Sequence, residues 1–192
     1  MQNSLNKNLS ETKEVINKSL EDAELNKKFK EAVDLSIKSL SNDGSIYIAG
    51  NGGSASQADH FVGELVGRFH IEGDSLKVYS LNSNPVVITA IANDFSYEEI
   101  YSQQLNGQLK KNDLFIGIST SGNSKNINNA IDVCNKKGND TILLTGSKSI
   151  EVSSNSSLVI RVPSENTPTI QEVHIVLLHS LAEEIEKALR NK

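Results

Sequence analysis

The stretch Ile46-Tyr47-Ile48-Ala49-Gly50-Asn51-Gly52-Gly53-Ser54-Ala55 begins as an apolar run and ends in a glycine-rich turn. Its first five residues have the length and composition of a buried parallel strand. The glycines let the backbone turn sharply and approach a ligand closely. Free N–H groups at the start of the helix that follows would face that ligand and favour an anion. The stretch therefore predicts a strand, a turn and a helix that together bind an anionic group.

The rest of the chain alternates between strand and helix patterns. Amphipathic helices are expected over residues 4–21 and 24–40, before the first strand. Further strands are expected at 76–81, 114–118, 141–145 and 158–162, and helices at 54–68, 85–92, 98–106, 125–137 and 167–190. This alternation predicts an α/β three-layer sandwich, with a central parallel five-stranded sheet and helices on both faces. Ligands then belong at the carboxyl ends of the strands.

Length and composition indicate one domain over residues 1–192, with helices for packing or oligomerisation in 1–43 and the α/β core in 44–192. The net charge of -5 and the pI of about 5.4 argue against a nucleic-acid surface. No apolar run is long enough for a membrane helix, and the polar N-terminus does not resemble a signal peptide. We therefore expect a cytoplasmic protein. The single cysteine, Cys134, fits the apolar face of a helix and is expected in the core.

His60 and Glu64 lie four residues apart on the helix expected after the glycine turn, so they share one face. Such a pair is commonly a solvated surface pair. Its position directly after a phosphate-type turn favours a functional role here.

The glycine turn also fits a loose dinucleotide fingerprint, Gly50-x-Gly52-x-x-Ala55. That fingerprint requires a carboxylate at the end of the second strand to bind the ribose. The second strand instead ends in Ser80-Leu81-Asn82-Ser83. Dinucleotide binding is therefore disfavoured.

A second loop, Ser119-Thr120-Ser121-Gly122-Asn123-Ser124, also follows a buried strand and opens a helix. Its hydroxyls and backbone N–H groups suit a phosphate dianion without lysine or arginine. The alternative is an ordinary serine-rich turn that caps a helix. Two such loops in one sheet favour a sugar-phosphate site.

Together these motifs resemble the sugar isomerase (SIS) domain family over essentially the whole chain. The residues that carry the resemblance are Gly50–Ala55 with His60 and Glu64, Ile118–Ser124, Val162-Pro163-Ser164, and Ile170-Gln171-Glu172 with His179. Within the family, His60, Glu64, Gln171 and His179 are the marks of an isomerase. His174 fits a structural role, His70 has no assigned role, and Arg68 could contact phosphate or a second subunit.

The resemblance implies an aldose–ketose isomerase that converts sedoheptulose 7-phosphate to D-glycero-D-manno-heptose 7-phosphate, the first step toward activated heptose for lipopolysaccharide or other surface glycans. It also implies a homotetramer with active sites between subunits, and one zinc ion per subunit held by His60, Glu64, Gln171 and His179. The substrate-binding positions that it implies are Asn51, Gly52, Gly53, Glu64, Asn93, Asp94, Ser119, Thr120, Ser121, Ser124 and Gln171.

The chemistry of these residues agrees with that activity. Moving a proton between C1 and C2 through an enediol(ate) requires a base near carbon and an acid near oxygen. We expect Glu64 to be the base and His179 the acid, with a metal ion polarising the carbonyl. Gln171 and His179 lie eight residues apart, about 12 Å along a helix, so a single ion needs an irregular helix, opposed side chains or a second subunit.

Two other functions stay open at this point. One is a non-catalytic SIS protein that binds sugar phosphates or associates with a replication initiator, although such relatives lose catalytic positions that this chain keeps in Glu64 and His179. The other is a different aldose–ketose isomerase or a sugar-phosphate-sensing regulator. Regulators of that kind add a helix-turn-helix domain, and the residues before the first strand are too few for one.

Overall fold

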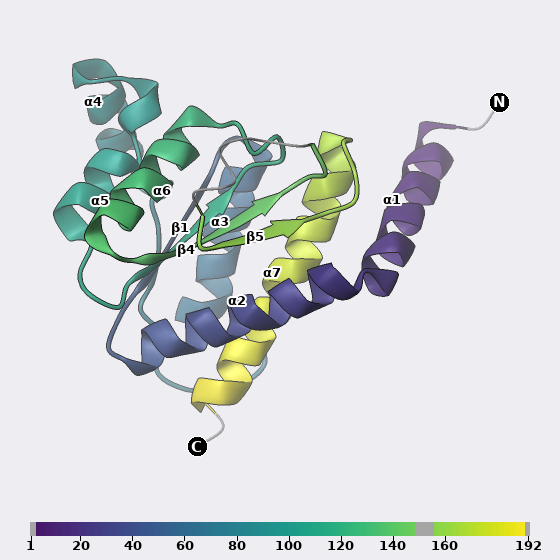
Figure 1. The fold of residues 1–192 in the computed structure, drawn as a ribbon, viewed down its shortest axis with the longest axis horizontal. Helices are drawn as coiled ribbons and strands as arrows, with labels where there is room; N and C mark the ends of the chain where they lie inside the picture. The colour runs from purple at the N-terminus through teal and green to yellow at the C-terminus, as the bar shows by residue number, and fades with distance from the viewer. Residues whose placement is uncertain (1–2, 149–155, 191–192) are drawn as a thin grey trace.

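The computed structural model describes residues 3–148 and 156–190. Its centre is a sheet of five parallel strands in the order β2-β1-β3-β4-β5. The strands are β1 (Ile46–Gly50), β2 (Val78–Ser80), β3 (Leu114–Ile118), β4 (Asp140–Thr145) and β5 (Leu158–Arg161). Helices cover both faces (Figure 1). The predicted fold class is therefore confirmed.

Seven α-helices and one 3-10 turn connect and flank these strands in the described residues. They are α1 (Ser4–Glu21), α2 (Ala23–Ser41), α3 (Gly53–Val66), α4 (Pro85–Asp94), the 3-10 turn η1 (Tyr97–Glu99), α5 (Ser102–Gln108), α6 (Lys125–Lys137) and α7 (Thr167–Arg190). Most predicted ranges agree to within two residues. The sequence also predicts a serine-rich loop over 146–157, between the fourth and fifth strands, and this range lies partly outside the described residues.

Three predicted ranges differ from the structure. The helix expected over 54–68 ends at Val66, because Gly67 follows and closes it. The helix expected over 98–106 divides into η1 and α5. The strand expected over 76–81 is only three residues long, because β2 lies at the edge of the sheet and pairs with β1 alone.

Alternate residues of the strands supply two separate cores. Ile46 and Ile48 face one side, where apolar side chains of α2, α3 and α7 pack against them. Tyr47 and Ala49 face the other side, where α5 and α6 pack. Burying both faces explains why the strands read as continuous apolar runs rather than as alternating ones.

The N-terminal helices differ in how they contact the body of the protein. α2 contributes Leu25 and Ala32 to the core beneath the sheet. α1 projects beside the start of α7 (Figure 1), where Val15 packs against Val173. The boundary between residues 43 and 44 stays a prediction.

The order of the strands places two loops side by side. From β1 the chain crosses to β2 on one side, whereas β3 and β4 lie on the other. At such a reversal the loops leaving the carboxyl ends of the two central strands diverge and leave a crevice. These are the glycine turn after β1 and the serine loop after β3, so the fold brings together the two predicted anion-binding loops.

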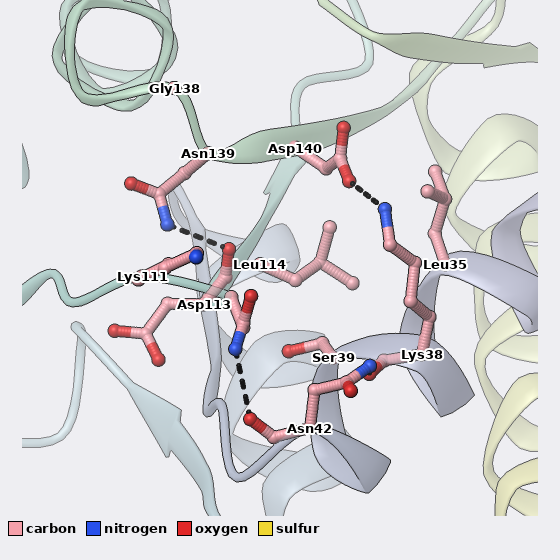
Figure 2. Close-up of a pocket in the computed structure, with 11 residues that line it drawn as sticks. Leu35, Lys38, Ser39, Asn42, Lys111, Asp113, Leu114, Gly138, Asn139 and Asp140 are labelled. Atoms are coloured by element: carbon pink, nitrogen blue, oxygen red, sulfur yellow. Dashed lines mark hydrogen bonds and ion pairs between the residues drawn. The ribbon is translucent and has the colours of Figure 1, made fainter.

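A pocket of about 140 Å³ lies at the opposite edge, near the amino ends of β3 and β4 (Figure 2). Several of its polar groups are bonded within the fold. Lys38 Nζ is 3.2 Å from an Asp140 carboxylate oxygen, and the Asn139 amide donates to the Asp113 carbonyl at 3.0 Å. We therefore interpret this pocket as a structural junction. Among the described residues, no helix has the length and hydropathy of a membrane span.

Candidate active site

The glycine turn between β1 and α3 has a backbone that other residues adopt with difficulty. Gly52 has φ 55° and ψ -120°, a combination that is strained for residues with a side chain. Gly53 faces Gln171 on α7, and a Cβ built on Gly53 would lie 2.7 Å from the Gln171 amide nitrogen. The turn therefore requires glycine at Gly52, whereas a side chain at Gly53 would have to displace the end of the Gln171 side chain. The turn also brings the predicted substrate-binding residues Gly53 and Gln171 together.

Asn51 is held by a network of amides and phenols. Its amide and that of Asn126 are hydrogen-bonded to each other in both directions, each at 2.9 Å. Its carbonyl oxygen also accepts from the Tyr97 hydroxyl at 2.9 Å, while Tyr101 donates to the Gly50 carbonyl. Because the Asn51 oxygen is already bonded, the group that remains for a ligand is the second N–H of its amide.

The serine loop is the second loop at this edge of the sheet. Ser119 is buried, and its hydroxyl lies 2.9 Å from that of Ser124. Thr120 is half-buried and Ser121 is exposed. The Ser124 side chain does not cap α6, so the first N–H groups of this helix are not occupied by the cap residue. The loop therefore offers hydroxyls and a helix N-terminus to an anion.

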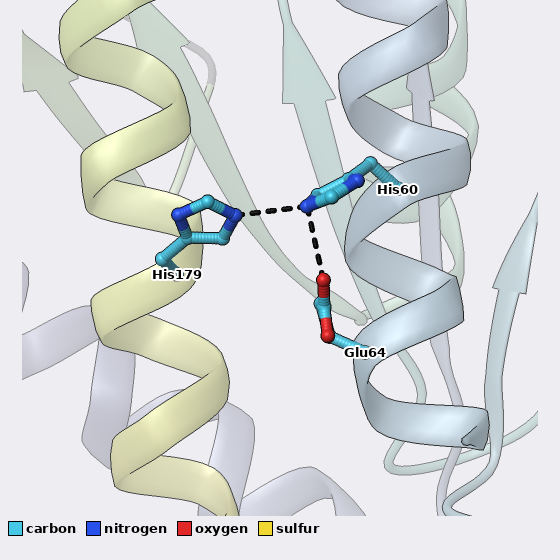
Figure 3. A group of neighbouring side chains, drawn as sticks. All are labelled: His60, Glu64 and His179. Carbon is cyan, nitrogen blue, oxygen red and sulfur yellow. Dashed lines mark hydrogen bonds and ion pairs between the residues drawn. The ribbon is translucent and has the colours of Figure 1, made fainter. Parts of the chain in front are cut away.

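His60, Glu64 and His179 converge between α3 and α7 (Figure 3). His60 Nε2 is 2.8 Å from His179 Nε2 and 3.0 Å from Glu64 Oε1. The His60 and Glu64 side chains are 47% and 22% exposed, so the group is open to solvent. It lies on the flank of α3 that is turned away from Phe61 and Leu65, which face the sheet.

This group fits a divalent metal ion. Zinc binds nitrogen and oxygen ligands at about 2.0–2.2 Å in a tetrahedron, and a catalytic zinc commonly has three protein ligands and one open position. Two imidazoles and a carboxylate form such a set, and their donor atoms all lie within 4.8 Å of one another. The single hydrogen on His60 Nε2 can bond to only one of its two neighbours, His179 or Glu64. A cation could be bound by all three side chains.

Gln171, the fourth predicted ligand, lies two helical turns away from this group. Its amide packs over Gly53 at the start of α3, and its backbone carbonyl accepts from the Gln57 side chain at 2.6 Å. His179 follows it by eight residues on the unbroken helix α7, about 12 Å along the axis. Gln171 as a metal ligand therefore stays a prediction.

Asn93 and Asp94 are exposed at the C-terminal end of α4, and the Asn93 amide donates to the Asp94 carboxylate at 2.9 Å. In the part of the chain that the structure describes, no hydrogen bond joins them to either loop. Their role in substrate binding also stays a prediction.

The predicted residues thus form two main groups within one chain. The loop group lies at the carboxyl edge of the sheet and comprises Asn51, Gly52, Gly53, Ser119, Thr120, Ser121 and Ser124. The ion group, His60, Glu64 and His179, lies farther along α3 and α7. Glu64 follows Gly53 by eleven residues, about 16 Å along the helix.

The sequence did not point to three residues that hold the glycine turn, and it indicated structural roles for two others. The pattern gave no signal for Asn126, Tyr97 or Tyr101, because their contacts with residues 50 and 51 depend on the tertiary fold. Cys134 and His174 are fully buried, as expected. Burial raises the pKa of the Cys134 thiol to about 12.

Comparison with known proteins places the chain in a family. A model of the SIS domain matches residues 10–146. A phosphoheptose isomerase from Helicobacter pylori (strain P12) is 43% identical over 180 residues, which cover 94% of this chain and 93% of the relative. The chain therefore belongs to the SIS domain family.

Solved structures agree with this assignment. A phosphoheptose isomerase from Neisseria gonorrhoeae superimposes with a TM-score of 0.87 at 30% identity, covering 94% of this chain and 97% of that one. One from Francisella tularensis gives 0.89 at 29% identity, covering 97% and 100%. Within the family the chain is thus similar to phosphoheptose isomerases, and it is an isomerase. The resemblance stated from the motifs is confirmed.

Proposed function

We propose that this protein converts sedoheptulose 7-phosphate to D-glycero-D-manno-heptose 7-phosphate. The observation that carries the proposal is the convergence of His60, Glu64 and His179, because an isomerase needs a base and an acid at one place. The names of its relatives, which are phosphoheptose isomerases, support a heptose phosphate as the substrate. The absence of a carboxylate after β2 argues against a nucleotide in the crevice.

The loop group is proposed to bind the phosphate and the sugar. Ser119, Thr120, Ser121 and Ser124 would donate hydroxyl hydrogen bonds, and the N-terminus of α6 would add backbone N–H groups. Asn51 would donate its remaining N–H to a substrate oxygen. Binding by neutral donors suits a chain with a net negative charge, since it requires no basic cluster.

Glu64 is proposed to take the proton from one carbon and return it to the neighbouring one. Oε1 faces His60, so the second carboxylate oxygen is the one that we assign to the substrate carbon. His179 is proposed to move the proton between the two substrate oxygens. When bound by His60, Glu64 and His179, a zinc ion would polarise the carbonyl and stabilise the enediolate charge.

The separation of the two groups supports an active site shared between subunits. If the phosphate binds the loop group of one chain, the ion group of a neighbouring chain could meet the reacting carbons. α4 supports assembly as well, because its apolar sequence PVVITAIAND has no fully buried residue and Val86 is 73% exposed. We propose a homotetramer in the cytoplasm that supplies activated heptose for surface glycans.

Turnover can be measured by incubating the purified protein with sedoheptulose 7-phosphate in D₂O. We expect heptose 7-phosphate that carries deuterium at the carbon that receives the proton, detected by NMR and mass spectrometry. Glu64→Gln removes the base and should lower kcat by about 10²–10⁴-fold with little effect on folding.

Glu31→Gln on α2 is the matched control, because this exposed glutamate pairs with Lys27 on the same helix. It should retain full activity. Absence of turnover by the wild type would refute the proposed reaction. Full turnover by Glu64→Gln would refute the assignment of the base. Chelation followed by readdition of zinc tests the ion separately.

A further inference from the structure

A carboxylate outside the proposed machinery holds the loop that follows α3. Glu186, near the end of α7, is 0% exposed. Its carboxylate accepts hydrogen bonds from the backbone N–H groups of Phe69 at 3.0 Å, His70 at 2.8 Å and Ile71 at 3.0 Å. Burial alone would raise its pKa, but these donors and Arg190 hold the pKa below its ordinary value.

Arg190, one turn farther along α7, completes this arrangement. One of its terminal nitrogens donates to Glu186. The other donates to the Leu65 carbonyl at 2.7 Å and to the Gly67 carbonyl at 3.1 Å. These carbonyls lie at the C-terminal end of α3, where the backbone lacks partners within the helix. Further bonds reach the carbonyls of Ile71 and Asp74.

Such a pair is a costly way to gain stability alone. Removing two charges from water carries a penalty that an apolar pair of similar volume avoids. What the pair provides is a fixed geometry, because the Glu186 carboxylate accepts from four donors in fixed directions, three of them from consecutive residues of the loop. We call Glu186 and Arg190 the buried latch.

The loop that the latch holds contacts the ion group. The Phe69 ring is stacked on the His179 ring, with centroids 5.5 Å apart and planes at 25°. His179 in turn faces His60. The same loop begins three residues after Glu64, and the latch residues lie on the same helix as His179. The latch therefore fixes the C-terminal ends of both helices that carry the ion group, α3 and α7.

We propose that Glu186 and Arg190 are positioning residues for the ion group, acting through Phe69, whose ring sets the orientation of His179. This inference rests on the proposed function, since it assigns a purpose to the geometry of the proposed zinc ligands. It predicts that damage to the latch weakens metal binding in a protein that is still folded.

Zinc affinity can be measured by competition with a chelating dye, at a temperature where circular dichroism shows each variant folded. Glu186→Gln keeps the shape of the side chain but turns an N–H₂ group toward backbone donors. Phe69→Leu removes the ring and keeps an apolar side chain. Each should raise the zinc Kd by about 10-fold, as is typical when a partner that orients a metal ligand is lost.

Glu183→Gln is the matched control, because Glu183 lies one turn earlier on α7 and pairs with Lys187. Its Kd should stay within about twofold of wild type. The Glu186→Gln/Phe69→Leu double variant should bind zinc no more weakly than the worse single variant, because both changes act through the same ring. A purely structural role would lower the melting temperature and leave Kd unchanged.

A second readout does not need the metal. NMR cross-peaks between the Phe69 and His179 rings should appear in the metal-free wild type and in Glu183→Gln, and they should be lost in Glu186→Gln. Folded latch variants with unchanged Kd and unchanged cross-peaks would overturn the inference. A wild type that binds no zinc would overturn the proposed ion instead, and the cross-peaks alone would then decide whether the latch positions His179.

Discussion

Two histidines on α7, five residues apart, differ in how deeply they are buried and in which groups they contact. His174 is fully buried and lies 3.3 Å from the Thr145 carbonyl, to which its Nε2–H donates. His179 is half-buried and faces His60 on α3. The sequence pattern placed both on one helix but could not measure burial, so the family resemblance was needed to separate their roles.

Burial also makes His174 a source of acid sensitivity. It lowers the pKa of the folded-state imidazole from 6.5 to about 4. Because the folded-state pKa is the lower one, the unfolded chain binds the extra proton, and stability falls as the pH drops from 6.5 toward 4. Between pH 7 and pH 4.5 we expect a loss of about 2 kcal/mol from this residue.

Urea unfolding of wild type and His174→Gln at the two pH values checks this prediction. The variant should be less stable at pH 7 but should lose about 2 kcal/mol less on acidification. Equal losses in the two proteins would show that His174 is not the titrating group.

At the scale of an element, the turn before α3 requires glycine, whereas a glycine inside α3 can be replaced by another residue. Gly52 in the turn has a positive φ of 55°. Gly63 lies inside the helix, and a Cβ built on it meets no atom within 4 Å. Replacing each glycine by alanine should therefore have opposite effects on stability.

Gly52→Ala should destabilise the protein by about 1–3 kcal/mol, because alanine is strained in that conformation. Gly63→Ala should stabilise it by about 0.5–1 kcal/mol, because alanine has the higher helix propensity. Urea unfolding of both variants gives the two free energies. A stabilising Gly52→Ala would contradict the conformation described for the turn.

The sequence predicted the elements well where burial produced a plain pattern. β1, β3, α6 and α7 begin and end within a residue of the expected positions. The edge strand β2 was overestimated because its apolar residues continue beyond its pairing with β1. The end of α3 was misplaced by two residues, because Gly67 closes the helix and Arg190, from a distant helix, binds the Leu65 carbonyl at this end.

For the whole molecule, the predicted site residues other than Asn93 and Asp94 lie at the carboxyl edge of the sheet and on α3 and α7, in two groups rather than one cluster. The turn and serine loop meet at the switch of strand order, as expected for a parallel sheet. His60, Glu64 and His179 form a separate group on the helical layer. One-dimensional spacing could not show this division, because it depends on how α3 and α7 lie beside each other.

A shared active site predicts complementation between two inactive variants. Ser121→Asp places a negative charge in the loop group, and Glu64→Gln removes the base. When the two proteins are unfolded together and refolded at equal amounts, about a quarter of the sites should contain an intact loop from one chain and an intact ion group from another.

Isomerase activity of the mixture should then reach about a quarter of the wild-type value, while each variant refolded alone stays inactive. Wild type refolded in the same way is the control for recovery. A mixture as inactive as its components would indicate that each site is built from one chain.

The pairing of His60 with His179 also has a consequence for synthesis of the protein on the ribosome. The two residues are 119 positions apart. At about 5–20 residues per second, His60 and Glu64 emerge roughly 6–24 s before their partner. During that interval the nascent chain carries two exposed donors without the third. Capture of the proposed zinc ion would therefore have to wait for α7 to leave the ribosome and dock beside α3.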